Sequence, residues 1–231
     1  MENEIIKNIS QSNISTSDLI NAMKTNINNA VIIGKCCNRI RDLANDEMYR
    51  NEIGDNNGIQ VILQAMRMHI DEALVQVNAC AALQKLAFSD SKYVTPARIE
   101  APYVVLTNTN NLRKNVNTYN HTNSMELQEE FECCSSPTEQ LNFNVQNMKQ
   151  IIYYSGLQDI LNAMKYHPDH LPVQLYGICA LVCFTFSSEY LRLLNDCDES
   201  KYLLEAAARR FPLMCRNDAR NALDRLSELS A

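Results

Sequence analysis

Apolar residues recur along this chain at helical spacing, and groups of them return in the same order. Val75, Ala79, Leu83 and Leu86 fall on one stripe of a helix that we expect over residues 71–87. The stripe returns as Val173, Gly177, Leu181 and Phe184, and again as Cys215, Ala219, Leu223 and Leu226. Because each copy keeps helical spacing, the pattern predicts an all-α chain.

A longer phrase repeats together with the stripe. The dipeptide Ala-Met at position 22 returns at position 65, 43 residues on, and at position 163, 98 residues further. Each copy continues into the apolar helix described above. A period of this length is typical of stacked helical units, each too small to bury its apolar face alone. The sequence therefore predicts a repeat protein.

The longer interval exceeds two periods by 12 residues, which predicts a degenerate copy with an insertion between Phe88 and Lys149. Residues 107–124 are polar and rich in Asn, a composition that buries too little apolar surface to offset chain entropy, and we expect a loop there. The whole chain, 1–231, is then one domain. We place its five units at about residues 1–44, 45–88, 89–138, 139–186 and 187–231.

The sequence also predicts helix breaks and helix caps inside the units. Gly58 and Gly156 mark the step from the first helix to the second, where a sharp turn is needed. Asn28, Asp71 and Asp169 share one position ahead of the third helix, where an acceptor side chain can cap the first turn.

These features resemble armadillo repeats, three-helix units that stack into a right-handed superhelix. The resemblance rests on the frame G-I/L-x-x-I-L-x-A-M-x-x-H-x-D-x-x-x-V-Q, on the segment A-C-A-A-L or I-C-A-L, and on lead-ins such as MYRNEIGDNNG from Met48. It covers nearly the whole chain apart from the Asn-rich insertion. It implies a right-handed α-solenoid of about five repeats, whose third helices line a concave groove. The two-helix HEAT repeat is the structural neighbour.

The likeness does not extend to nuclear-import receptors, whose third helices carry ladders of Trp and Asn. This chain contains no Trp, and Asn38, Ala81, Cys179 and Asn221 stand in the matching positions. The resemblance instead implies a groove of mixed chemistry that binds a protein or peptide. Its candidate residues are Lys35, Asn38, Asp42, Asn78, Ala81, Lys85, Tyr176, Cys179, Cys183, Asn221 and Arg225.

Charge and hydropathy narrow the partners and the compartment. With 27 acidic against 21 basic residues the net charge is −6, which argues against general nucleic-acid binding. The longest apolar stretch, Leu175 to Phe186, is too short to span a membrane. The first ten residues lack the features of a signal peptide. We expect an intracellular protein, in the cytoplasm or alternatively in the nucleus.

No catalytic, cofactor or metal site is expected. The chain has no Gly-rich phosphate loop, no His-Glu-x-x-His helix and no Gly-x-Ser-x-Gly elbow. Cys179 and Cys183 lie four apart on one helix face, but a structural zinc site needs two further ligands. The odd number of cysteines, nine, argues against a disulfide framework. We expect them to be packing residues and the chain not to be an enzyme.

Three functional hypotheses remain. The first is a protein-interaction module or scaffold that binds its partner along the third-helix groove. The second is an assembly element that self-associates through its ends or outer face, and the third is a regulatory subunit of a separate enzyme. Arg39 stands where Ala82 and Ala180 sit in later units, as a solvent-facing end would require, so we expect a monomer. The insertion is either a tolerated loop or a partner-contacting segment.

Overall fold

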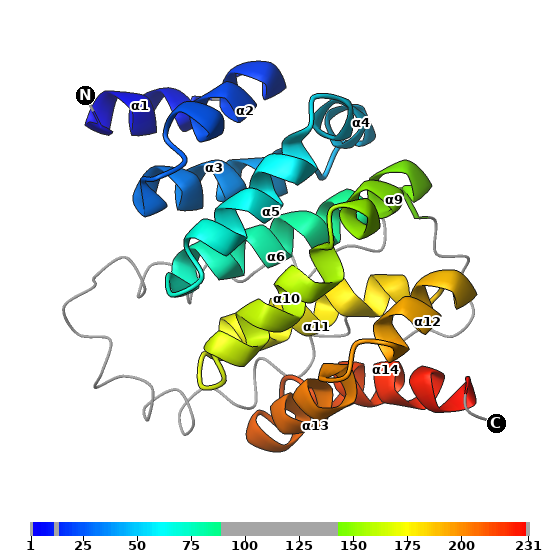
Figure 1. Ribbon diagram of the computed structural model, residues 1–231. Coiled ribbons are helices and arrows are strands. Elements are labelled where there is room, and N and C mark those ends of the chain that lie inside the picture. Colours follow the sequence, from blue (N-terminus) through cyan, green and yellow to red (C-terminus); the bar gives the residue numbers. More distant parts are fainter. Residues whose placement is uncertain (1, 12–13, 89–142, 230–231) are drawn as a thin grey trace.

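The computed structural model describes residues 2–11, 14–88 and 143–229 (Figure 1). Across these ranges all regular secondary structure is helical, apart from one isolated antiparallel bridge between Phe88 and Phe143. The prediction of an all-α fold is therefore confirmed for the described chain. None of the described helices is long and apolar enough to cross a membrane.

The helices follow one another in triplets. The first triplet is α1 (Glu2–Ile9), α2 (Thr16–Thr25) and α3 (Ala30–Leu43), and the second is α4 (Glu47–Asp55), α5 (Gly58–Met68) and α6 (Ala73–Ala87). After the undescribed residues come α9 (Val145–Tyr153), α10 (Gly156–Tyr166) and α11 (Leu171–Phe184). The last triplet is α12 (Ser188–Asn195), α13 (Ser200–Arg210) and α14 (Arg216–Glu228). Each triplet falls within one of the predicted units.

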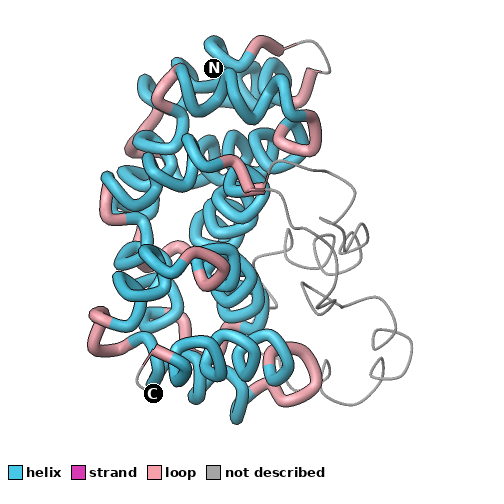
Figure 2. Tube along the Cα trace, turned by 90° about the vertical axis from the view of Figure 1, so that its right-hand side faces the viewer, coloured by secondary structure: helices cyan, strands magenta, loops and turns pink. Residues whose placement is uncertain are grey.

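The triplets stack so that corresponding helices lie side by side. The third helices form one layer in the order α3, α6, α11 and α14, and the second helices form another in the order α2, α5, α10 and α13 (Figures 1 and 2). Each triplet packs on its neighbours along the stack, which is the arrangement expected of a helical-repeat chain. Met23, Met66 and Met164, which open the repeated phrase, are fully buried at one recurring core position.

The triplet that ends in α6 packs directly on the triplet that ends in α11. The amide of Asn144 donates to the carbonyl of Ala87 at 2.9 Å, so Phe88 and Phe143, which border the undescribed residues, lie side by side. The long interval between these copies is thus one step of the stack. This differs from the order we expected, with the unit 89–138 standing between them. That unit and the loop 107–124 lie outside the described residues.

Two recurring residues of the repeat frame hold the stack together. His69 and His167 each place Nε2 2.6 Å from a backbone carbonyl of the preceding triplet, at Ile27 and Ile70. Because Ile27 and Ile70 occupy the same position in successive triplets, the histidines link neighbours rather than form a site. The geometry also shows independently that the triplet containing His167 follows the triplet containing Ile70.

Two recurring glutamines donate hydrogen bonds within their own triplets. Gln76 donates through Nε2 to the carbonyls of Met66 and His69, at 3.0 and 2.7 Å. Gln174 donates in the same way to Met164 and His167, at 2.7 and 2.9 Å. Both glutamines are buried, and a buried carbonyl at a helix end costs free energy unless it finds a donor. This explains why the frame ends in Val-Gln.

The turn between first and second helices is made differently from our prediction. The left-handed backbone lies at Asn57 and Ser155, with φ of 63° and 64°, and not at the glycines that follow them. Gly58 and Gly156 instead begin the second helices, where the chain passes too close to the preceding helix for a side chain. The helix caps are also one residue later than predicted, at Asn29, Glu72 and His170.

Candidate partner-binding surface

The predicted groove residues fall into three classes of exposure. Lys35 and Asp42 are exposed. Asn38, Lys85, Tyr176, Asn221 and Arg225 are half-buried. Asn78, Ala81, Cys179 and Cys183 are buried. We call the exposed and half-buried set the third-helix face, because its members lie on α3, α6, α11 and α14. The four buried residues are not available to a partner.

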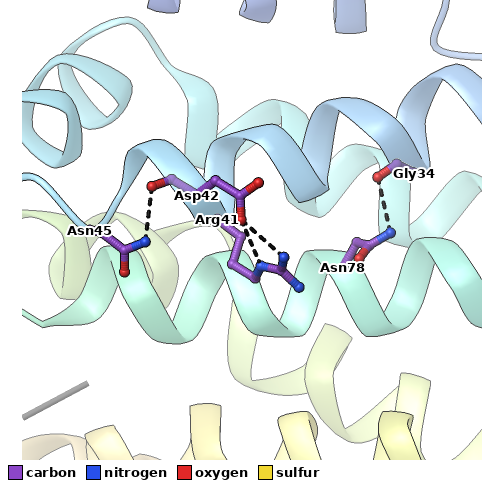
Figure 3. Close-up of polar contacts among 5 residues, drawn as sticks. All are labelled: Gly34, Arg41, Asp42, Asn45 and Asn78. Atoms are coloured by element: carbon purple, nitrogen blue, oxygen red, sulfur yellow. Dashed lines mark hydrogen bonds and ion pairs between the residues drawn. The ribbon is translucent and has the colours of Figure 1, made fainter. Parts of the chain in front are cut away.

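Asn78 has a structural role between two triplets. Its Nδ2 donates to the carbonyl of Gly34 at 3.0 Å, which ties α6 to α3 (Figure 3). A Cβ at Gly34 would meet the Leu74 side chain at 3.6 Å and Nδ2 of Asn78 at 3.8 Å, so the contact does not itself require glycine. We expected Asn78 to face a ligand, whereas its side chain is buried and its Nδ2 is bonded within the stack.

Polar contacts order the end of α3. Arg41 donates through Nε and Nη2 to Oδ1 of Asp42, at 3.2 and 2.9 Å, and reaches from α3 toward α6 (Figure 3). Asn45 donates to the backbone carbonyl of Asp42 at 3.0 Å. The Asp42 carboxylate is therefore already engaged by a cation of its own helix, which reduces its negative charge toward a partner.

Arg225 is less free than the sequence suggested. Its Nη1 donates to Oγ1 of Thr185 at 2.9 Å, and its guanidinium carbon lies 3.6 Å from the centre of the Phe186 ring. A cation over an aromatic face at this distance is attractive. We predicted Arg225 as a groove residue, and the structure shows that it also fastens α14 to the end of α11. Reversing its charge would disturb the stack as well as the surface.

A row of aromatic rings at this end of the third helices escaped the sequence analysis. The Phe143 ring lies 5.2 Å from that of Phe88 and 5.3 Å from that of Phe186, measured between ring centres. Phe88 and Phe186 follow α6 and α11 at equivalent positions, and this register was the available signal. The row ends at Arg225. It connects the ends of α6 and α11 with the start of α9.

The described cysteines are packing residues rather than reactive groups. All are free thiols, and all but Cys197 are buried. Burial raises the pKa of Cys36, Cys80 and Cys215 to about 12 in each case, so the thiolate needed for nucleophilic or metal chemistry does not form near neutral pH. No group of His, Cys, Asp and Glu within the described ranges could hold a metal ion.

One histidine near the face is also structural. His170 caps α11, with Nδ1 accepting a hydrogen bond from the amide of Val173 at 3.4 Å. Burial, helped by the nearby His167, lowers the pKa of His170 to about 4. The ring is then neutral at physiological pH, as an acceptor must be. This histidine therefore supports a helix end.

The fold and surface define this chain as an all-α protein with helical-repeat-like architecture. Comparison with protein-family models, with curated proteins and with solved structures found no match.

Proposed function

We propose that this chain is a non-catalytic protein-interaction module, a right-handed α-solenoid of armadillo type, that holds a protein or peptide partner on its third-helix face. The observation that carries the proposal is that one layer of four helices, drawn from successive triplets, presents exposed and half-buried side chains at regular steps. This matches the use of stacked repeats as extended binding surfaces.

The physical reason lies in how the face is held. The His69 and His167 contacts, and the Asn78 bond from α6 to α3, fix the triplets that end in α3, α6 and α11 relative to one another. Side chains on such a scaffold lose little freedom when a partner docks, so the ordering cost falls mainly on the partner. Self-association and service as an enzyme's regulatory subunit remain the alternative hypotheses, and the cytoplasm remains the compartment that composition favours.

Partner capture from the native cell tests this proposal. We expect proteins retained by the wild-type chain to be lost when Lys35 and Lys85 are both changed to glutamate, because both lie on the third-helix face. Lys149→Glu with Lys201→Glu is the matched control, since these lysines are exposed on α9 and α13 and the change in net charge is the same. The measurement is quantitative mass spectrometry of captured proteins, with melting curves to verify folding.

The control decides the outcome. Equal losses from both double variants, or loss from neither, would contradict binding through the third-helix face. A wild-type chain that captures only further copies of itself would favour the self-association hypothesis instead.

A further inference from the structure

The charge of the third-helix layer has the opposite sign to that of the chain. On α3, α6 and α11 the basic residues are Lys35, Arg39, Arg41 and Lys85, and the one acidic residue of these three helices is Asp42. The fourth helix of the layer, α14, adds Arg216, Arg220 and Arg225 and the same number of acids, Asp218, Asp224 and Glu228, so the layer holds seven basic against four acidic residues. Arg41 already engages the Asp42 carboxylate. The chain as a whole carries a net charge of −6. The layer is therefore a positive surface on an acidic protein.

Other exposed acidic residues lie on the first helices of the triplets. Glu2 and Glu4 are exposed on α1, and Glu47, Glu52 and Asp55 are exposed on α4. Neither helix belongs to the third-helix layer. This separation of charge across the stack concentrates attraction for an anion on one side, and it disfavours approach of the same ligand to the first helices.

Apolar side chains lie beside the cations. Val31, which stands one helical turn before Lys35 on α3, is 50% exposed, and Leu74 on α6 is 36% exposed. Leu74 lies against Gly34, where a Cβ would meet its side chain at 3.6 Å, so the two apolar residues border the same part of the layer as Lys35. Tyr176 is half-buried on α11, at the repeat position that Lys35 occupies in the first triplet. Such a surface suits a ligand with apolar as well as charged groups.

We propose that the partner of the third-helix face is an acidic, amphipathic segment of another protein, whose carboxylates meet Lys35 and Lys85 and whose apolar side chains cover Val31, Leu74 and Tyr176. This inference rests on the proposed function and adds the chemical class of the partner. Charge complementarity of this kind speeds association and excludes basic competitors.

A nucleic acid is the other polyanion that a positive surface could attract. The structure favours the protein segment, because the cations are few and stand among apolar side chains, and because the rest of the molecule repels a long polyanion. Oligonucleotide binding is therefore included as an outcome of the test.

The test uses the full chain and two labelled peptides of about 16 residues, the length of an amphipathic helix that fills a groove. One peptide carries Glu and Leu at helical spacing, and the other has Lys in place of each Glu. We expect fluorescence anisotropy to show binding of the acidic peptide and none of the basic peptide. Lys35→Glu with Lys85→Glu should weaken the binding by about tenfold or more, whereas Lys149→Glu with Lys201→Glu should not. Raising NaCl from about 50 to about 500 mM should also weaken it.

Several results would overturn the proposal. One is equal binding of the basic peptide, or equal weakening in the two double variants. Another is a single-stranded oligonucleotide of matched charge that binds as tightly as the acidic peptide and loses affinity in the same variant. If cellular partners are lost from the Lys35 and Lys85 variant but the acidic peptide does not bind, the partner class is wrong and the docking function stands. If neither responds, both are wrong.

Discussion

Gly58→Ala should lower the free energy of unfolding by about 3 kcal/mol, at the upper end of the cost of overpacking a well-filled site. A Cβ at Gly58 would lie 2.6 Å from Cγ2 of Ile53, 2.8 Å from the Ile53 carbonyl oxygen and 3.2 Å from Cδ1 of Ile20. The carbonyl is backbone and cannot rotate away, so either the α4–α5 turn or the contact with the first triplet must shift. Urea unfolding followed by circular dichroism measures the loss.

Gly34→Ala is the matched control. Gly34 is buried in the middle of α3, and a Cβ there meets nothing nearer than 3.6 Å, an ordinary van der Waals contact. Because alanine favours helix over glycine by about 1 kcal/mol, this variant should be as stable as the wild type or slightly more stable. Gly156→Ala should repeat the Gly58 result, since its Cβ would lie 2.8 Å from the carbonyl oxygen of Ile151. Similar effects at Gly34 and Gly58 would contradict the close approach that we assign to Gly58.

Asp218→Gln should stabilise the chain at alkaline pH and flatten the pH dependence of its stability. Asp218 is 4% exposed, and burial raises its pKa from the usual 3.8 to about 7. It stands at the same spacing from the helix-end residue Phe211 as Gln76 and Gln174 stand from His69 and His167. The last triplet therefore places an acid where the two preceding triplets place an amide that donates two hydrogen bonds.

The direction of this pH dependence follows from proton linkage. The native state binds the Asp218 proton more tightly than the unfolded state. The stability that this proton contributes is fully present below about pH 4 and is lost as the pH rises through about 7. A shift of about three pKa units corresponds to about 4 kcal/mol at most. We expect the variant to exceed the wild type by about 2–4 kcal/mol at pH 8 and to show little or no gain at pH 4.

Chemical unfolding at several pH values measures this difference. Asp224→Asn, at an exposed position on the same helix, is the control and should leave the pH profile of the wild type unchanged. A gain from Asp218→Gln that is equal at pH 4 and pH 8 would show that packing, and not ionisation, is responsible.

Much of the fold could be predicted from sequence because repeats amplify weak signals. The apolar stripes that begin at Val75 and Val173 located two of the third helices, and both residues are buried as expected. The position of Gly58 showed where the first helix of a unit ends. The all-helical class and the boundaries of the described triplets needed only spacing, since helical periodicity is a local property of the chain.

What could not be predicted depends on contacts between distant residues. Spacing placed Asn78 on the third helix but could not show that its amide bonds to Gly34 of the previous triplet. Nor could it show that Arg225 lies over Phe186. The interval between Ala65 and Ala163 was compatible with an intervening unit, and the contacts of α6 with α11 and of His167 with Ile70 show a single step. Burial of candidate site residues is likewise a tertiary property.

The central claim is that triplets far apart in sequence are consecutive in one stack and so form a continuous third-helix layer. It is tested most directly by replacing residues 89–142 with a Gly/Ser linker of about six residues and measuring urea unfolding. Since Phe88 and Phe143 are paired neighbours, and since loop length changes stability by only about 0.6 kcal/mol per doubling, we expect one cooperative transition with a midpoint close to that of the wild type. A variant that fails to fold, or that unfolds in two separate transitions, would contradict the claim.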